Sequence, residues 1–243
     1  MAAVVGRPPA AVGGGVSAVG VHRRRADRAL VREKAETLLA DDFFRLAHHD
    51  LTGRPLLHPV ALGTGLAAAL VGELVVSGHV AVISGHVLVV RRRDRPRDGL
   101  SVGVLSLLWR EVHPLGTWLE FLAGSAVVEV GARLVRAGQV RVVRSRRLVR
   151  GRAVYVPLDV LEAARPRAVL ATRLMNGLGL EDEYVVLAGL MVATGLDATI
   201  LAGAPPGARA HVRGLVAGLP AAFAELFAHT ETLVGSAVLA HRT

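Results

Sequence analysis

Two clusters of arginine are the residues in this chain whose type and spacing could do chemistry. The stretch RRRDRPR holds five arginines within positions 91–97, and the stretch RVVRSRRLVRGR holds six within positions 141–152. A guanidinium group binds phosphate through paired hydrogen bonds, so such clusters suit an anionic membrane, a phosphorylated headgroup or nucleic acid. The candidate anion-binding residues are Arg91, Arg92, Arg93, Arg141, Arg144, Arg146, Arg147 and Arg150.

The second cluster is the stronger candidate of the two. Asp94 and Asp98 lie among or beside the arginines of the first cluster and offset part of their charge, whereas the second cluster contains no acidic residue. Near an anionic membrane each arginine contributes about 1 kcal/mol. The second cluster also has apolar residues that could enter the headgroup layer. These are Val142, Val143, Leu148 and Val149.

The net charge is weaker evidence for a polyanionic partner than its size suggests. The formal net charge is +9, but Lys34 is the only lysine in the chain. Such one-sided use of arginine is also typical of a GC-rich coding sequence. The positions of the arginines are therefore more informative than their number.

We expect no catalytic residue, metal or cofactor. The chain has no cysteine, which excludes disulfides, thiolate metal sites and cysteine nucleophiles, and it lacks the GxSxG, HExxH and GxxxxGK motifs. His48 and His49 would point about 100° apart on a helix, so we expect them, with Asp50, to be surface residues at a helix end. Asp41 and Asp42 are explained by the dipole at a helix start.

The composition predicts a mainly α protein. Hydrophobic residues make up 52% of the chain and aromatic residues only 4%, so the core must be built from Leu, Val and Ala, which suits packed helices. We predict a single helical domain with two or more small β-hairpins over residues 31–243. Residues 1–30 are rich in Gly, Ala and Pro and then basic, and we predict a disordered tail there without an export signal.

The first arginine cluster is predicted to follow a helix and a hairpin. A helical stripe covers residues 33–47, and a buried helix begins after Pro59 and ends at the glycine cap Gly78. Two β-branched runs separated by Ser84 and Gly85 then predict a hairpin.

The second arginine cluster follows a similar arrangement. Residues 100–136 are helical in pattern, with interruptions at Pro114 and Gly124, and end at the cap Gly138. A hairpin over residues 140–156 then carries the second cluster around its turn.

The rest of the chain is predicted to be helical, beginning with Asp159 as an N-cap. The apolar segment 185–204 approaches the length of a membrane span but contains Asp197. A charge at the membrane midplane costs about 3 kcal/mol. We therefore predict two short core helices in this segment, in a soluble or peripheral protein.

The order and spacing of five leucine-rich segments resemble the Golgi phosphoprotein 3 family, including its bacterial, actinobacterial-type members. The resemblance covers residues 36–235. The segments are TLLADDFFRLAHHDLTGRPLL, GLAAALVGELVVSGHVAV, GTWLEFLAG, RLVRAGQV and VPLDVLEAARPRAVLATRL.

This resemblance implies a non-enzymatic, mainly helical domain that docks on the cytoplasmic side of membranes as a peripheral protein. Eukaryotic members recognise phosphatidylinositol 4-phosphate and bind the cytosolic tails of membrane proteins. They use a hairpin, at about 140–156 in this chain, for lipid contact and for self-association. The partners expected from the family are thus anionic membrane lipids, such tails and a second copy of the chain, with nucleic acid disfavoured.

The family's headgroup pocket is altered here. Its tryptophan falls on His58, and its three arginines fall on Ala67, Gly124 and Val127. Arg133 and Arg136, three residues apart on one helix, are candidate substitutes. The candidate headgroup pocket is therefore His58, Arg133 and Arg136.

Two other functions are open at this point. A helix followed by a hairpin is also the outline of a winged-helix DNA-binding regulator, although the helix before the first hairpin carries only Glu73 as a charged residue. The other function is a protein-binding adaptor whose arginines only keep its loops soluble.

Overall fold

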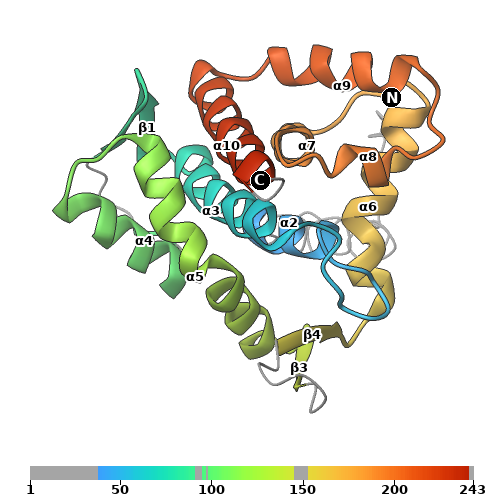
Figure 1. Ribbon diagram of the computed structural model, residues 1–243, viewed down its shortest axis with the longest axis horizontal. Helices are drawn as coiled ribbons and strands as arrows, with labels where there is room; N and C mark the ends of the chain where they lie inside the picture. The colour runs from blue at the N-terminus through green and yellow to red at the C-terminus, as the bar shows by residue number, and fades with distance from the viewer. Residues whose placement is uncertain (1–37, 91–94, 97, 145–152, 241–243) are drawn as a thin grey trace, which may run out of the picture. The chain divides into compact units, whose positions relative to one another are not determined.

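The computed structural model of the protein describes residues 38–90, 95–96, 98–144 and 153–240, which lie in a compact unit beginning at Leu38. In this part of the chain nine helices and two antiparallel two-stranded sheets form (Figure 1), which confirms the mainly α fold. The elements are α2 (Leu39–Leu46), α3 (Pro59–Val76), β1 (Val80–Ile83), β2 (His86–Val89), α4 (Gly99–Arg110), α5 (Leu115–Arg136), β3 (Val140–Arg144), β4 (Ala153–Pro157), α6 (Val160–Met175), α7 (Asp182–Ala193), α8 (Asp197–Ile200), α9 (Gly207–Ala217) and α10 (Ala221–Ala240).

Helix α3 is the central helix of the core. Its N-cap His58 accepts a hydrogen bond from the Val60 amide and Pro59 occupies its first turn, while Gly78 ends it with φ +69°. Of its 18 residues, 14 are buried. Among the described residues it is the one helix long and apolar enough to cross a membrane, but its burial within the protein is that of a core helix.

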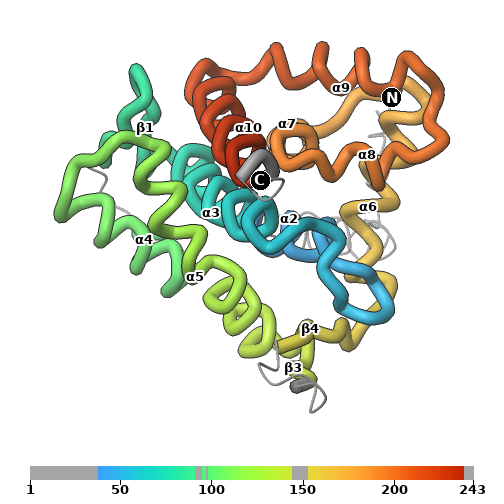
Figure 2. Tube along the Cα trace, viewed as in Figure 1, coloured from blue at the N-terminus to red at the C-terminus, as the bar shows by residue number. Residues whose placement is uncertain are grey.

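The neighbours of α3 form layers on its two sides. Helices α5 and α4 pack on one side, and α10 and α7 pack on another (Figure 1), and α2 also contacts α3. Figure 2 shows the C-terminal helices α6 to α10 on the side of the molecule away from α4. The core therefore surrounds α3, and most of its side chains are Leu, Val and Ala.

Helices α3 and α5 run side by side in the same direction. In the N-terminal half of each helix, Gly63 packs directly against the backbone carbonyl of Ala123. Ten residues further along each helix, Glu73 forms an ion pair with Arg133 at 3.0 Å. Equal advance along both helices requires a parallel arrangement, so their C-terminal ends lie together.

The two hairpins are attached at opposite ends of α5 (Figure 1). At the tip of the first hairpin, the Gly85 carbonyl accepts a hydrogen bond from the amide of Leu115, the first residue of α5. The second hairpin begins after the C-terminal cap of α5 at Gly138, which has φ +68°. A helix of 22 residues is about 33 Å long.

Most helix boundaries agree with the sequence. The break at Pro114, the cap at Gly138 and the N-cap at Asp159 are confirmed, and the segment 185–204 is divided at Gly195. The predicted interruption at Gly124 is wrong, because a single exposed glycine costs a helix only about 1 kcal/mol and α5 continues through it. The predicted tail, residues 1–30, lies outside the described residues.

Candidate functional site

A buried ion-pair network lies where α2, α3 and the start of α4 meet the C-terminal part of α5. At its centre is Arg133, whose side chain is 9% exposed. Its Nε donates to Asp41 at 2.9 Å, its Nη2 to Glu73 at 3.0 Å and its Nη1 to Asp98 at 3.1 Å. One guanidinium therefore faces three carboxylates.

Each of these carboxylates also has a structural task. Glu73 accepts hydrogen bonds from the Ala40 amide at 2.8 Å and the Ser101 hydroxyl at 3.2 Å. Asp98 caps α4 by accepting from the amides of Leu100 and Ser101. The network thus joins four segments of the chain into one unit.

The three carboxyl groups titrate differently because their surroundings differ. Burial raises the pKa of both Asp41 and Glu73, and the charge of Arg133 offsets only part of this rise. Burial also acts to raise the pKa of Asp98, but hydrogen bonds from Ser101 together with the charge of Arg133 outweigh it and leave that pKa lowered. Burial therefore raises the pKa of Asp41 and of Glu73, whereas the pKa of Asp98 in the same network is lowered.

The candidate headgroup pocket of His58, Arg133 and Arg136 is not assembled in the structure. The guanidinium of Arg133 is buried among carboxylates, so it is not available to a phosphate. His58 is exposed at the N-terminal end of α3, and Arg136 is exposed at the C-terminal end of α5. Because the two helices are parallel, these ends are separated by roughly 25 Å.

Both arginine clusters join the fold close to the C-terminal ends of α3 and α5. Residues 91–97 follow Val90, whose amide donates to the carbonyl of His79 just beyond α3, and they end at Asp98, which is bonded to Arg133. The second hairpin begins at Val140, four residues after α5 ends. We call this region the basic end, defined by Val90, Asp98 and the strands β3 and β4.

The candidate arginines lie partly within the described residues. Arg141 is exposed on β3, and Arg144 is the last residue of that strand. Arg91, Arg92, Arg93, Arg146, Arg147 and Arg150 lie outside the described residues. The structure therefore places the two ends of each cluster but not these side chains.

The base of the second hairpin packs on the core through Val140 and Tyr155, while residues 141–143 of β3 are exposed. Tyr155 is buried, and it is paired with Val142 across the sheet. The alternate face carries Arg141 and Val143, paired with Val156 and Val154. Val142 and Val143 are each 43% exposed, so the described base of the hairpin combines a cation with exposed apolar side chains.

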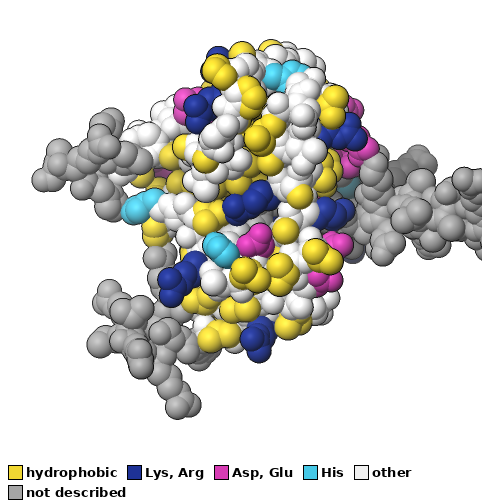
Figure 3. Space-filling view, turned by 90° about the vertical axis from the view of Figure 1, so that its right-hand side faces the viewer, with side chains coloured by type: hydrophobic (Ala, Val, Ile, Leu, Met, Phe, Trp, Pro, Cys, Tyr) yellow, Lys and Arg dark blue, Asp and Glu magenta, His cyan; other side chains and the backbone are white. Residues whose placement is uncertain are grey.

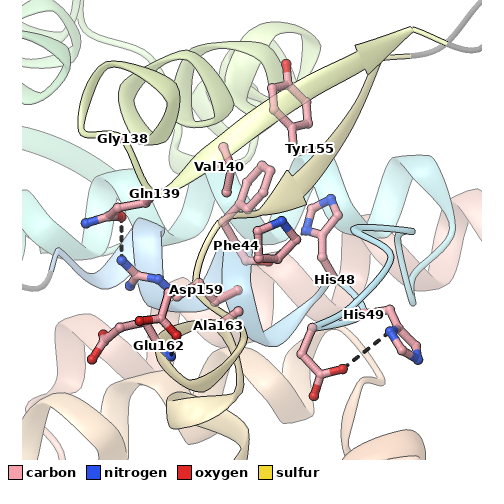
Figure 4. A pocket seen from close by; sticks show the side chains of 13 residues that line it. Phe44, His48, His49, Gly138, Gln139, Val140, Tyr155, Asp159, Glu162 and Ala163 are labelled. Atoms are coloured by element: carbon pink, nitrogen blue, oxygen red, sulfur yellow. Dashed lines mark hydrogen bonds and ion pairs between the residues drawn. The ribbon is translucent and has the colours of Figure 1, made fainter.

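A cavity of about 120 Å³ lies beneath this hairpin, between α2, the turn before β3 and the start of α6 (Figure 4). Its lining residues are Phe44, Arg45, His48, His49, Asp50, Gly138, Gln139, Val140, Tyr155, Pro157, Asp159, Glu162 and Ala163. The ring of His48 stacks on Phe44 with 4.0 Å between ring centroids, and Phe44 meets Tyr155 edge to face at 5.4 Å.

His48 corrects the expectation of surface histidines at this helix end. It is 4% exposed, and burial lowers the pKa of its imidazole to about 4, although a hydrogen bond with the Phe44 carbonyl acts in the opposite direction. The spacing of Phe44 and His48, four residues apart, was a signal of one shared helix face. Across the described residues, no three His, Asp or Glu side chains converge as metal ligands would.

Figure 3 shows the face of the molecule that lies on the right-hand side of Figure 1. Its basic side chains are scattered among apolar and acidic ones. On the helices of this side of the molecule, Arg209 pairs with Asp197 at 3.1 Å, and Arg165 pairs with Glu162 at 3.5 Å. Such exposed pairs contribute little.

The helix before the first hairpin cannot act as a DNA recognition helix. That helix is α3, and its burial confirms that it is a core helix. A recognition helix must expose one face to the major groove. The winged-helix interpretation therefore loses the element that would read DNA.

A comparison with protein families matches residues 39–230 to the family described as Golgi phosphoprotein 3 (GPP34). A comparison with individual curated proteins gives no match. The matched range contains every element from α2 to α9, the ion-pair network, both hairpins and the cavity. The chain therefore belongs to the Golgi phosphoprotein 3 family.

Proposed function

We propose that this protein is a non-enzymatic, cytoplasmic, peripheral membrane protein that meets anionic lipid through its basic end. The observation that carries the proposal is the convergence of the flanks of both arginine clusters: Asp98, which ends the first cluster, is bonded to Arg133, seven residues before the second hairpin starts. The first three of these steps lie within α5 and advance by only about 5 Å, and a short turn through Gly138 then leads into β3. Two cationic segments that join the fold so close together can act on one membrane surface.

The chemistry of the second hairpin supports the same orientation. Its described base exposes Arg141 beside Val143, and the sequence continues with arginine and with the apolar pair Leu148 and Val149. Peripheral membrane segments combine cationic residues, which meet lipid phosphates, with apolar residues that enter the headgroup layer. Neither feature alone gives stable adhesion.

Electrostatics sets the expected strength and its salt dependence. Each arginine close to an anionic surface contributes about 1 kcal/mol, so removal of two should weaken binding about 30-fold. The attraction is screened over roughly 8 Å at physiological ionic strength. Binding should therefore fall when the salt concentration is raised.

The test is co-sedimentation with vesicles of phosphatidylcholine containing phosphatidylserine. We expect Arg146→Ser with Arg147→Ser to reduce binding strongly. The matched control is Arg209→Ser with Arg213→Ser, which removes the same charge from exposed positions of α9. Equal binding by the two double variants would refute the role of the hairpin.

Headgroup specificity is a finer part of the proposal. The family resemblance suggests phosphatidylinositol 4-phosphate. However, the guanidinium of Arg133 is buried in an ion pair with Glu73, and Ala67, which stands at the position of a family pocket arginine, is fully buried. We therefore expect binding to follow the anionic charge of the vesicle rather than one headgroup. Vesicles that match phosphatidylserine and phosphatidylinositol 4-phosphate in total charge measure this directly.

Association with tails of membrane proteins and with a second copy of the chain remains part of the family-based proposal. A DNA-binding regulator is the competing outcome of the vesicle experiment. Retention of random duplex DNA at moderate salt, without vesicle binding, would favour that function. Retention of neither would favour an adaptor that binds only protein.

A further inference from the structure

We infer that the cavity beneath the second hairpin binds a primary ammonium group of the ethanolamine type. The cavity is distinct from the arginine clusters and does not require that the hairpin meet a membrane. In Figure 4, Phe44, His48 and Tyr155 lie on one side of it, and Asp159 and Glu162 lie on another. Aromatic faces combined with carboxylates are the surroundings that an organic cation prefers.

His48 supplies a fixed hydrogen-bond acceptor. Its Nδ1 lies 2.7 Å from the carbonyl oxygen of Phe44, which can only accept, so Nδ1 carries the proton of the neutral ring. Nε2 is then an acceptor, and it has no partner among the described residues. An acceptor that lines a cavity and has no protein partner is open to a donor from a ligand or from water.

The carboxylates around the cavity add further acceptors. Asp159 uses Oδ1 to cap α6, which leaves its second oxygen for other contacts. Glu162 follows one turn later on the same helix and lies 3.5 Å from Arg165. Asp50 lies on the opposite rim, 3.3 Å from the ring of His49.

The cationic residue of the lining is already engaged. Arg45 donates from Nη1 to Asp42 at 2.6 Å and from Nη2 to the Gln139 side chain at 2.6 Å. An anionic ligand would therefore meet three carboxylates, of which Glu162 is already paired with Arg165, while the guanidinium of Arg45 is held by Asp42 and Gln139. The groups that remain are acceptors, and they favour a ligand that brings N–H donors and positive charge.

The size of the cavity limits the ligand. Sites that enclose whole small molecules usually measure about 300–1,000 Å³, whereas this one measures about 120 Å³. It suits an aminoethyl group and excludes a sugar or a nucleotide. The ammonium group could belong to a free amine or to the headgroup of phosphatidylethanolamine.

The first arm of the test is a titration of the full chain with ethanolamine, followed by NMR or calorimetry. We expect saturable binding with a Kd on the order of 1–10 mM, and much weaker binding of choline, which has no N–H donor, and of neutral ethylene glycol. Equal responses to ethanolamine and ethylene glycol would overturn the inference.

Variants locate the binding within the cavity. His48→Phe keeps the ring stack but removes the acceptor, and Asp159→Asn keeps the N-cap while removing the charge. Each should raise the Kd for ethanolamine at least fivefold in protein that circular dichroism shows to be folded. Glu183→Gln, in the exposed first turn of α7, is the matched control. An unchanged Kd in both cavity variants would also overturn the inference.

The second arm separates the two sources of the ammonium group. Vesicles of constant phosphatidylserine content are prepared with phosphatidylethanolamine in place of phosphatidylcholine. Stronger binding that His48→Phe abolishes assigns the lipid headgroup, whereas ethanolamine binding without a vesicle effect assigns a free amine. The double variant Arg146→Ser with Arg147→Ser tests the proposed function alone. It should lose vesicle binding but still bind ethanolamine as the wild type does, because neither residue lines the cavity.

Discussion

Acidification should destabilise this protein through His48. In the folded protein burial lowers the pKa of the imidazole from 6.5 to about 4, so the folded state binds fewer protons than the unfolded state between these values. The stability from the neutral ring is fully present above pH 6.5 and is lost as the pH falls toward 4. At pH 5 the unfolded chain is stabilised by protonation by about 2 kcal/mol, and below pH 4 by about 3 kcal/mol.

The assay is urea unfolding followed by circular dichroism at pH 7.5 and pH 5.0. His48→Gln removes the titrating group but can still donate to the Phe44 carbonyl, which the ring contacts at 2.7 Å. The free energy of unfolding of the wild type should fall by about 2 kcal/mol more than that of the variant between these pH values. Other titrating groups are common to both proteins and cancel in the difference.

His49→Gln makes the same chemical change at the neighbouring, half-buried ring and serves as the control. If the wild type and His48→Gln lose equal stability on acidification, the buried ring does not carry the penalty. The same result would remove the argument that Nε2 of His48 is a neutral acceptor at pH 5.

Two further predictions concern α5. Arg133→Met should lower the free energy of unfolding by about 3–5 kcal/mol, because three carboxylates lose their buried cation. Urea unfolding measures this loss. A smaller loss at pH 5 than at pH 8 would show that the carboxyl groups take up protons when the cation is removed. Gly131→Ala should cost about 1–3 kcal/mol, because the added methyl group would overlap the ring of Tyr155, whereas Gly124→Ala meets open space and should be neutral or stabilising. Thermal unfolding of the two glycine variants side by side checks this, and equal melting temperatures would contradict it.

The fold was largely predictable because its signals are local. Gly78 and Gly138 adopt positive φ angles at helix ends, Asp159 caps α6, and Pro114 separates α4 from α5. Each of these depends on a residue and its immediate neighbours. The predicted break at Gly124 is wrong because the free-energy cost of one glycine within a helix is small compared with the packing of the 22-residue helix α5 against α3.

The sites were less predictable because they depend on contacts between distant residues. Asp41 fits the dipole of α2, but its partner Arg133 is 92 positions away. Helical spacing places Arg133 near Arg136, but it does not reveal that Arg133 is buried and Arg136 is exposed. The cavity is built from α2, the second hairpin and α6, which no motif connects.

Charge therefore has two separate tasks in this chain. The arginines that are conspicuous in the sequence form two clusters that we propose to meet a membrane, whereas Arg133, a single residue of α5, joins four segments in the interior. Because Asp98 both terminates the first cluster and binds Arg133, the internal network fixes where that cluster leaves the fold. Helix α5, which carries Arg133, leads into the second hairpin. Arg133 therefore holds close together the two points at which the arginine clusters join the fold, and we propose that these clusters act together on the membrane.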